Sequence, residues 1–353
     1  MDYQLDILTD LHSRDHLVEV PPDNQPRLMD QMTCHIRNQY VEYAIARSME
    51  RGEYQEYAPP KGIENLHESI LRDFDLDDTD AEVCVMDGSL PAIYQTIRYT
   101  CHPDTYRRFV DSEPAWGWPR RFSKREPITI PGKITPDDID DRSFVNICSP
   151  QNPVGFDYTS EELEALAIKA RSVGAWVLQD CTYKDYSKHF FPMYKIHPTK
   201  TITTWSMSKS PGMAGMRVGG VICSPKMMKE IFTLRPNQLG SSLPGQRAAA
   251  AALSFKKQWL PGLLQQVNEN REYIYNNLRI GSCPQPDKSN SVWIEFPKEH
   301  NSTTVTARLK EKKLMVRDGI YYKAWGYDGN FIKVGIAVPP KWIKELVYEI
   351  NNP

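Results

Sequence analysis

The stretch that decides the fold, residues 143–183, reads SFVNICSPQNPVGFDYTSEELEALAIKARSVGAWVLQDCTY. Its two ends are short apolar runs that are typical of buried strands. The segment TSEELEALAIKARSVG between them is typical of a helix. Thr159 or Ser160 begins this helix, Glu162 lies in its first turn, and Gly174 follows its end. A strand, a helix and a strand in this order predict two parallel strands covered by the helix.

The same alternation extends on both sides of this stretch. Upstream, AEVCVMDGS predicts a strand that leads into the helix LPAIYQTIRYT, and downstream TITTWSMSK and MRVGGVICSP predict two more strands. We therefore expect an α/β fold, with a large domain over residues 40–245 whose mostly parallel sheet is flanked by helices. Residues 1–39 and 246–353 are expected to form a smaller α+β domain, with a connecting helix near 243–278 that is interrupted around Pro261.

Composition excludes several classes of protein. The 353 residues carry a formal net charge of −2, which gives no large positive field for nucleic acid or for an acidic membrane surface. No stretch approaches the roughly 18 apolar residues of a membrane helix, and the acidic N-terminus lacks the apolar core of a signal peptide. A cytoplasmic protein that does not bind membranes or nucleic acid is expected.

Cysteines and basic residues add little to this interpretation. The seven cysteines are scattered singly without a CxxC pair, so neither a disulfide framework nor a metal site is expected. The basic run Arg120, Arg121, Lys124 and Arg125, followed by Glu126, is interpreted as a solvated turn, with a patch for a substrate anion as the alternative.

Polar side chains follow the predicted strands at the points where the strands end. In an open parallel sheet, ligands bind outside the carboxyl ends of the strands, so these side chains are candidates for a common site. The candidates at these positions are Gly88, Ser89, Asn152, Asp180, Tyr183, Ser206, Ser208 and Lys209.

Three segments carry a resemblance to a known family: SPQNPVG (149–155), QDCTY (179–183) and SMSKSPGMAGMRVGG (206–220). In this order and spacing they resemble the class I/II aminotransferases, the pyridoxal-phosphate enzymes of fold type I that include aspartate and histidinol-phosphate aminotransferases. Weaker similarity covers nearly the whole chain. A single SxSK segment would be a weak signal, whereas the three segments together are specific. The resemblance implies pyridoxal 5′-phosphate as the cofactor, amino acid and keto acid substrates, and a homodimer.

The residue types fit what this cofactor needs. Lys209 supplies the amine that holds the cofactor and moves a proton, and a surface lysine is the alternative. Asp180 matches the carboxylate that keeps the pyridine nitrogen protonated, although an aspartate at a strand end is commonly a turn or cap residue. By resemblance, Asn152 and Tyr183 donate hydrogen bonds to the phenolic oxygen of the ring. The alternatives for these two are a turn asparagine and a half-buried core tyrosine.

A phosphate needs hydroxyl groups, backbone amides at a helix N-terminus and a fixed positive charge. Gly88 and Ser89 begin a predicted helix, and Ser206, Ser208 and Arg217 match the rest of the family's phosphate site. Gly88 and Ser89 alone would be an ordinary helix start.

Two aromatic residues are assigned by resemblance. Trp116 in EPAWGW is the candidate ring that stacks on the cofactor, with Trp118 or simple burial in the core as alternatives. Tyr57 in EYAPPKG is the candidate that reaches the phosphate site of the neighbouring subunit. The alternative for Tyr57 is an ordinary exposed loop residue.

The chain departs from the family near its C-terminus. The family carries an arginine that binds the α-carboxylate of the substrate, whereas NFIKVGIAVP places Lys333 at that position. Lysine lacks the planar fork of arginine, so this change is not conservative. We expect Lys333, with Asn152, to bind substrate, and a structural lysine at a strand edge is the alternative. Arg317 in MVRDG also matches a family pattern and is interpreted as structural.

The resulting expectation is a homodimeric pyridoxal-phosphate-dependent aminotransferase that works by a ping-pong mechanism. The alternative is a lyase, decarboxylase or cyclase on the same fold, because the same residues hold the cofactor in all of these enzymes. A regulator that only senses the cofactor is a third hypothesis, which the presence of both Lys209 and Asp180 disfavours.

Overall fold

The computed structural model describes most of the chain. Residues 1–24, on which the expectation of no signal peptide rests, lie outside the described part. The same holds for Lys124 and Arg125 of the basic run. The described residues are 25–101, 107–123, 126–233, 240–283, 289–325 and 329–353. Within them, no helix is both long and apolar enough to cross a membrane.

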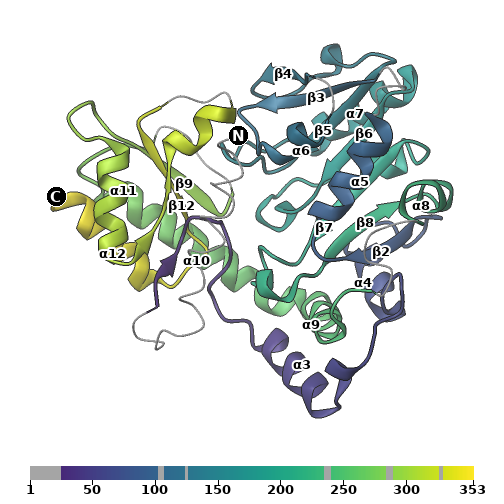
Figure 1. Ribbon diagram of the computed structural model, residues 1–353, viewed down its shortest axis with the longest axis horizontal. Coiled ribbons are helices and arrows are strands. Elements are labelled where there is room, and N and C mark those ends of the chain that lie inside the picture. The colour runs from purple at the N-terminus through teal and green to yellow at the C-terminus, as the bar shows by residue number, and fades with distance from the viewer. Residues whose placement is uncertain (1–24, 102–106, 124–125, 234–239, 284–288, 326–328) are drawn as a thin grey trace.

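The larger sheet lies in the right half of Figure 1. Its strands are β2 (Glu82–Met86), β3 (Arg108–Glu113), β4 (Ile128–Pro131), β5 (Ser143–Cys148), β6 (Trp176–Asp180), β7 (Thr201–Ser206) and β8 (Gly219–Cys223). They are arranged in the order β2-β8-β7-β6-β5-β3-β4. Strands β4, β3, β5, β6 and β7 are parallel neighbours, and β8 is antiparallel to β7 and β2. The predicted mostly parallel sheet is confirmed.

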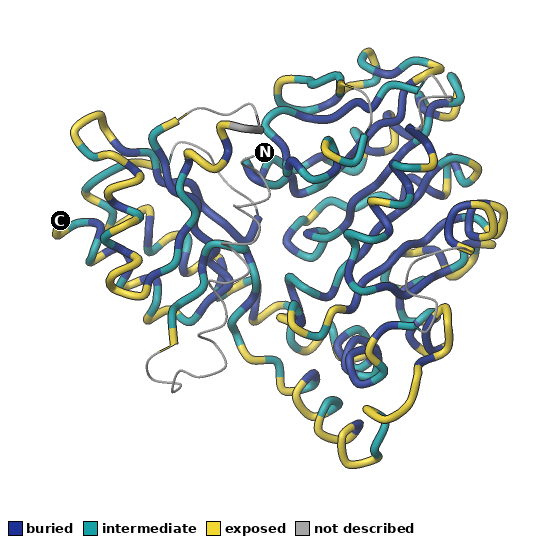
Figure 2. The backbone as a smooth tube through the Cα atoms, viewed as in Figure 1, coloured by how far each residue is buried: buried dark blue, intermediate teal, exposed yellow. Residues whose placement is uncertain are grey.

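The strands of this sheet are largely buried (Figure 2). They carry apolar residues on both sides, so helices cover both faces. In β2, Cys84 and Met86 lie in a core with one pair of helices, whereas Val83 and Val85 lie in a core on the opposite face. The first face packs on α5 (Leu90–Thr100) and α8 (Pro225–Phe232). The second packs on α4 (Glu64–Asp73), α7 (Ser160–Val173) and α9 (Leu243–Ser254).

Local sequence signals set the ends of α7 as predicted. Thr159 is the N-cap and its side chain accepts a hydrogen bond from the backbone N–H of Glu162, whose carboxylate accepts from the backbone N–H of Thr159. Gly174 ends the helix in the left-handed conformation, with φ of 72°. The helix therefore returns the chain to β6, next to β5.

A smaller unit lies beside the large sheet (Figure 1). Its antiparallel sheet has the order β11-β12-β9, and a separate parallel pair joins β1 to β10. The strands are β1 (Arg27–Leu28), β9 (Ser291–Glu295), β10 (Leu314–Met315), β11 (Arg317–Asp318) and β12 (Phe331–Gly335). Its helices are α10 (Lys256–Asn277), α11 (Ser302–Glu311) and α12 (Pro340–Asn351). The predicted α/β fold with a smaller α+β part is confirmed, and the domain boundaries themselves stay a prediction.

The expected break at Pro261 is wrong. The helices α9 and α10 meet at Phe255, and Pro261 lies inside α10 near its N-terminus. Pro261 lies beyond the first turn of α10, so the helix continues through it without the hydrogen bond that an N–H at this position would donate to the carbonyl of Lys257. The remaining short elements are α3 (Gln39–Glu50), α6 (Trp118–Phe122), and the 3-10 helices Glu53–Gln55, Pro136–Asp138, Lys184–Tyr186, Met193–Lys195, Ala214–Met216 and Gly319–Trp325.

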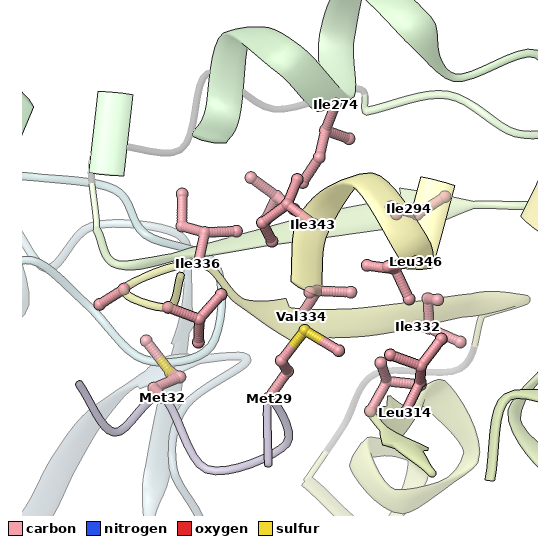
Figure 3. Close-up of a cluster of buried hydrophobic side chains, with 14 of the residues drawn as sticks. Met29, Met32, Ile274, Ile294, Leu314, Ile332, Val334, Ile336, Ile343 and Leu346 are labelled. Atoms are coloured by element: carbon pink, nitrogen blue, oxygen red, sulfur yellow. The ribbon is translucent and has the colours of Figure 1, made fainter. Parts of the chain in front are cut away.

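Figure 3 shows how the N-terminal segment joins the core of the smaller unit. Met29 and Met32 lie among side chains of β12 and the following turn, such as Val334 and Ile336, and all four are buried. Burying large apolar side chains of this kind contributes about 1.5–3 kcal/mol each. The residues between the two methionines are thereby fixed next to the carboxyl ends of the large sheet.

Candidate active site

A cavity of about 580 Å³ lies between the carboxyl ends of the large sheet and the smaller unit. The structure places eleven of the twelve predicted site residues on its wall. These are Gly88, Ser89, Trp116, Asn152, Asp180, Tyr183, Ser206, Ser208, Lys209, Arg217 and Lys333. Tyr57 does not line this cavity and is 79% exposed. Its predicted contact with a second subunit stays a prediction.

Lys209 lies in the loop that follows β7 and points into the cavity. Its Nζ donates a hydrogen bond to the backbone carbonyl of Gln31 at 2.7 Å and lies 5.5 Å from the centre of the Tyr183 ring. Burial lowers the pKa of the Lys209 ammonium to about 8, although the charges of Asp30 and Asp180 favour the protonated form. An amine with this pKa is neutral in roughly a tenth of the molecules at pH 7, a far larger share than for a lysine with the ordinary pKa of about 10.4, so it is more available as a nucleophile.

An ion cluster behind the cavity anchors the Lys209 loop. The hydroxyl of Ser210, the next residue, donates to Asp185, and the Nζ of Lys256 lies 2.5 Å from the same carboxylate. Asp73 accepts from Lys256 and from Lys184, both at 2.6 Å. Burial alone would raise the pKa of Asp185, but the two lysines hold it well below its usual range. The loop is thus tied to the helices α4 and α10.

Asp180 ends β6 beside Cys148 of β5 and is buried. Its Oδ1 accepts hydrogen bonds from the Thr182 hydroxyl at 2.7 Å, the Thr182 backbone N–H at 3.1 Å and the Thr204 hydroxyl at 3.1 Å. Its Oδ2 accepts none from the described residues. Burial raises the pKa of Asp180, which the hydrogen bonds and the charge of Lys209 oppose. A cation placed against Oδ2 would stabilise this carboxylate.

A second part of the cavity wall has the features of an anion site. Helix α5 begins there at Leu90, so its free backbone N–H groups face the cavity end that Gly88 and Ser89 line. The guanidinium of Arg217 donates to the carbonyls of Asp87 at 2.8 Å and Ala214 at 2.9 Å. A Cβ on Gly88, whose φ is 92°, would lie 2.7 Å from Nη2 of Arg217. Glycine is therefore required where the backbone approaches this guanidinium.

Three serine side chains lie on the same part of the cavity wall. The Ser206 hydroxyl accepts from the backbone N–H of Ser208 at 3.2 Å, and both serines are half-buried on the cavity wall. The Ser89 hydroxyl lies 3.3 Å from that of Thr182, the residue that also binds Asp180. The anion site and the carboxylate thus lie on one continuous wall.

Lys333 and Asn152 form one hydrogen-bonded unit with Tyr183. The Nζ of Lys333 donates to Oδ1 of Asn152 at 2.6 Å, and Nδ2 of Asn152 donates to the Tyr183 hydroxyl at 3.3 Å. Lys333 is 1% exposed and lies in β12, the middle strand of its sheet. The alternative of a lysine at a strand edge is therefore wrong.

Trp116 and Trp118 both line the cavity, so the structure does not choose between them by position. The interpretation of the neighbouring basic run as a solvated turn is wrong for Arg120. Its Nε lies 3.0 Å from Oδ2 of Asp111, a buried carboxylate that also accepts from Asn146 at 3.0 Å. Asp111 lies in the buried strand β3 and needs a counter-charge, which Arg120 supplies.

We expect Arg120→Ala to destabilise the protein by about 3–5 kcal/mol, because it leaves Asp111 buried without its cation. The matched control is Arg121→Ala, because Arg121 is an exposed neighbour on the same helix. Urea unfolding followed by circular dichroism measures both variants. Equal stability of the two would contradict the assigned ion pair.

Sequence reasoning missed several residues of the cavity wall. Asp30 and Gln31 come from the N-terminal segment, and Asp111 comes from β3. Asp111 directly follows the apolar pair Phe109 and Val110 in β3, which was at most a weak signal for a buried carboxylate. Nothing in the local sequence marks Asp30. Arg317, interpreted as structural, also lines the cavity.

Comparison with known proteins agrees with this geometry. A family model described as aminotransferase class I and II matches residues 25–350. The chain belongs to this family. The probable aspartate aminotransferase of Methanocaldococcus jannaschii is 24% identical over 320 residues, which cover 83% of this chain and 84% of that protein. The histidinol-phosphate aminotransferase of Methanopyrus kandleri is 26% identical over 179 residues, 50% of this chain and 44% of that protein.

The chain spans about half the length of the histidinol-phosphate aminotransferases it matches. Among solved structures, a mutant of Thermus thermophilus aspartate aminotransferase has a TM-score of 0.74 at 20% identity, covering 92% of this chain and 93% of that chain. The apo-BacF structure from Bacillus subtilis has a TM-score of 0.75 at 17% identity, covering 95% and 96%. At these identities the similarity establishes the shared fold of this family.

Proposed function

We propose that this member of the class I/II aminotransferase family uses pyridoxal 5′-phosphate to move an amino group between an amino acid and a keto acid in a ping-pong cycle. The observation that carries the proposal is the pairing of Lys209 and Asp180 across one cavity. The amine has a pKa lowered to about 8, and the carboxylate presents an oxygen that no described residue occupies. An anion site lies on the same wall.

The residues present fit this cofactor. When bound, pyridoxal phosphate supplies an electron sink that stabilises negative charge on the carbon bearing the substrate's amino group. Asp180 would face the pyridine nitrogen and keep it protonated. Tyr183 and Asn152 would donate to the phenolic oxygen, and Trp116 would stack on the ring.

The phosphate group would lie at the N-terminus of α5. Arg217 offers a fixed charge, Ser206 and Ser208 offer hydroxyl and amide groups, and Gly88 and Ser89 let the backbone approach. Charge-assisted hydrogen bonds of this kind are stronger than neutral ones and fix the position of the bound group.

Lys209 would hold the cofactor and then act as the base that moves a proton at the substrate. The neutral amine hydrogen-bonds to Gln31 from one side, which fixes its position over the cavity. Lys333, positioned by Asn152, would bind the carboxylate of the substrate as a point charge. We further propose that the protein acts as a cytoplasmic homodimer in which Tyr57, an exposed residue, contacts the second subunit.

The decisive test is transfer of a nitrogen-15 label from a panel of amino acids to a panel of keto acids. An aminotransferase gives labelled product amino acid without release of ammonia or carbon dioxide. Release of either gas without label transfer would instead indicate the lyase or decarboxylase alternative. Size-exclusion chromatography with light scattering tests the dimer.

The lowered pKa of Lys209 predicts a pH dependence. Cofactor capture by the apoprotein requires the neutral amine, so its rate is expected to rise with pH and level off above a midpoint of about 8. An exposed lysine would give a midpoint near its ordinary value of about 10.4. Stopped-flow absorbance of cofactor binding between these pH values measures the midpoint, and a value near the ordinary one would contradict the buried position.

A further inference from the structure

We infer that the cavity selects an amino acid with an uncharged aromatic side chain, rather than one with a second acid group. This inference rests on the proposed function and concerns the part of the cavity that faces the smaller unit. Three observations carry it: the pairing of Arg317, the pairing of Arg120, and the aromatic side chains on the wall.

Arg317 is the arginine that enters the cavity from the smaller unit. Its Nη2 lies 2.9 Å from Oδ2 of Asp30, and the two side chains are only 18% and 14% exposed. The guanidinium also lies 4.6 Å from the centre of the Tyr321 ring. A second acid group on the substrate would have to compete with Asp30 for this guanidinium, whose charge Asp30 already compensates, so the attraction for the substrate is weakened.

Asp30 is held in place by its own chain segment. Met29 and Met32 on either side of it are buried in the core of Figure 3, and the carbonyl of Met29 accepts from the backbone N–H of Gly335 at 2.6 Å. The Asn290 side chain donates to the carbonyl of Met32, also at 2.6 Å. Asp30 is therefore not on a loop that could swing away when an anion arrives.

The other arginine near this wall is also neutralised. Arg120 pairs with Asp111, which lines the cavity, and a second carboxylate, Glu113, lies 3.6 Å from its Nη1. The guanidinium charges of Arg317 and Arg120 are thus both compensated by carboxylates of the protein. Neither side chain offers an unpaired guanidinium to a dicarboxylic or phosphorylated substrate. A carboxylate brought next to Asp30 and Asp111 would also be repelled by them.

Aromatic side chains form the rest of the wall. Tyr321 and Tyr322 line the cavity from the smaller unit, and Trp116 and Trp118 line it from the large domain, where Trp116 packs against the cluster that contains Tyr322. Tyr322 is buried and packs against Phe331, with ring centres 5.8 Å apart, so its position is fixed. Rings of this kind favour stacking with an aromatic side chain.

The test measures binding of two unreactive carboxylates to the cofactor-loaded protein by calorimetry. 3-Phenylpropanoate mimics an aromatic substrate, and succinate mimics an acidic one. We expect wild type to bind 3-phenylpropanoate at least tenfold more tightly than succinate. Equal or tighter binding of succinate would overturn the inference, as would tighter binding of 5-aminopentanoate, which carries a distal ammonium group.

Two variants assign the effect to the ion pair. Asp30→Asn removes the counter-charge of Arg317, so succinate is expected to bind at least tenfold more tightly while 3-phenylpropanoate changes less than threefold. Asp137→Asn, an exposed carboxylate, is the matched control. No change in succinate binding by Asp30→Asn would overturn the role of Asp30.

Arg317→Met is the second variant, and it removes the other member of the ion pair. We expect it to leave 3-phenylpropanoate binding within threefold of wild type, because Arg317 is not the group that binds the substrate's carboxylate. A loss of tenfold or more would overturn the inference. Failure of the proposed function can be told apart from failure of this inference. If the proposed function were wrong, label transfer would be absent with every amino acid, however tightly 3-phenylpropanoate and succinate bind.

Discussion

Lys209→Ala is expected to abolish amino-group transfer, with a fall in turnover of at least about a thousandfold, since general base catalysis alone contributes on the order of 10²–10⁴. The variant loses both the group that holds the cofactor and the base that moves the proton. Turnover is measured as nitrogen-15 transfer, and cofactor content by absorbance after gel filtration. The control is Lys226→Ala, whose side chain is 82% exposed on α8.

The fold of Lys209→Ala should remain intact, because Lys209 lies on the wall of a cavity, so its truncation enlarges an existing space and removes the unfavourable burial of an ammonium group. Thermal unfolding of the apoprotein checks this. Retention of even a tenth of the wild-type turnover in a folded variant would contradict the role of Lys209.

Asp180→Asn is expected to lower turnover by roughly 10²–10³, the usual effect of removing one preorganised electrostatic group from an active site. The asparagine carbonyl can still accept from Thr182 and Thr204, so the local structure is preserved while the charge facing the cavity is lost. Single-turnover kinetics with saturating amino acid measure the effect. Asp137→Asn serves as the control here too.

A separate readout distinguishes the electrostatic role of Asp180 from a structural one. We expect Asp180→Asn to bind the cofactor more weakly and to shift its absorbance spectrum, because the ring nitrogen loses its counter-ion. An unchanged spectrum together with a lowered melting temperature would mean that Asp180 only supports the fold.

Five strands of the large sheet, β2 and β5 to β8, could be predicted because their information is local, whereas β3 and β4 were not predicted. Strand, helix and strand between residues 143 and 183 each carry their own signal, down to the Thr159 cap and the Gly174 terminus. The positions of Asn152, Asp180 and Lys209 followed from the rule that parallel strands bring their carboxyl ends to one edge. Their presence on one cavity wall agrees with that rule.

The rest of the site depends on contacts between distant parts of the chain. Asp30 and Arg317 are 287 residues apart in sequence, and nothing in LMDQMT predicts which cation the aspartate will meet. Arg120 was misinterpreted for the same reason, since its partner Asp111 lies on a strand rather than in the basic run. The turn at Phe255 was missed because Pro261 was the stronger local signal for a break, whereas α10 continues through this proline.

The most direct measurement identifies the lysine to which the cofactor is attached. The loaded protein is reduced with borohydride, digested, and analysed by peptide mass spectrometry to find the lysine that carries the cofactor's mass. We predict a single modified peptide whose modified residue is Lys209. Modification of a different lysine, or of none, would contradict the assignment of Lys209 as the residue that holds the cofactor.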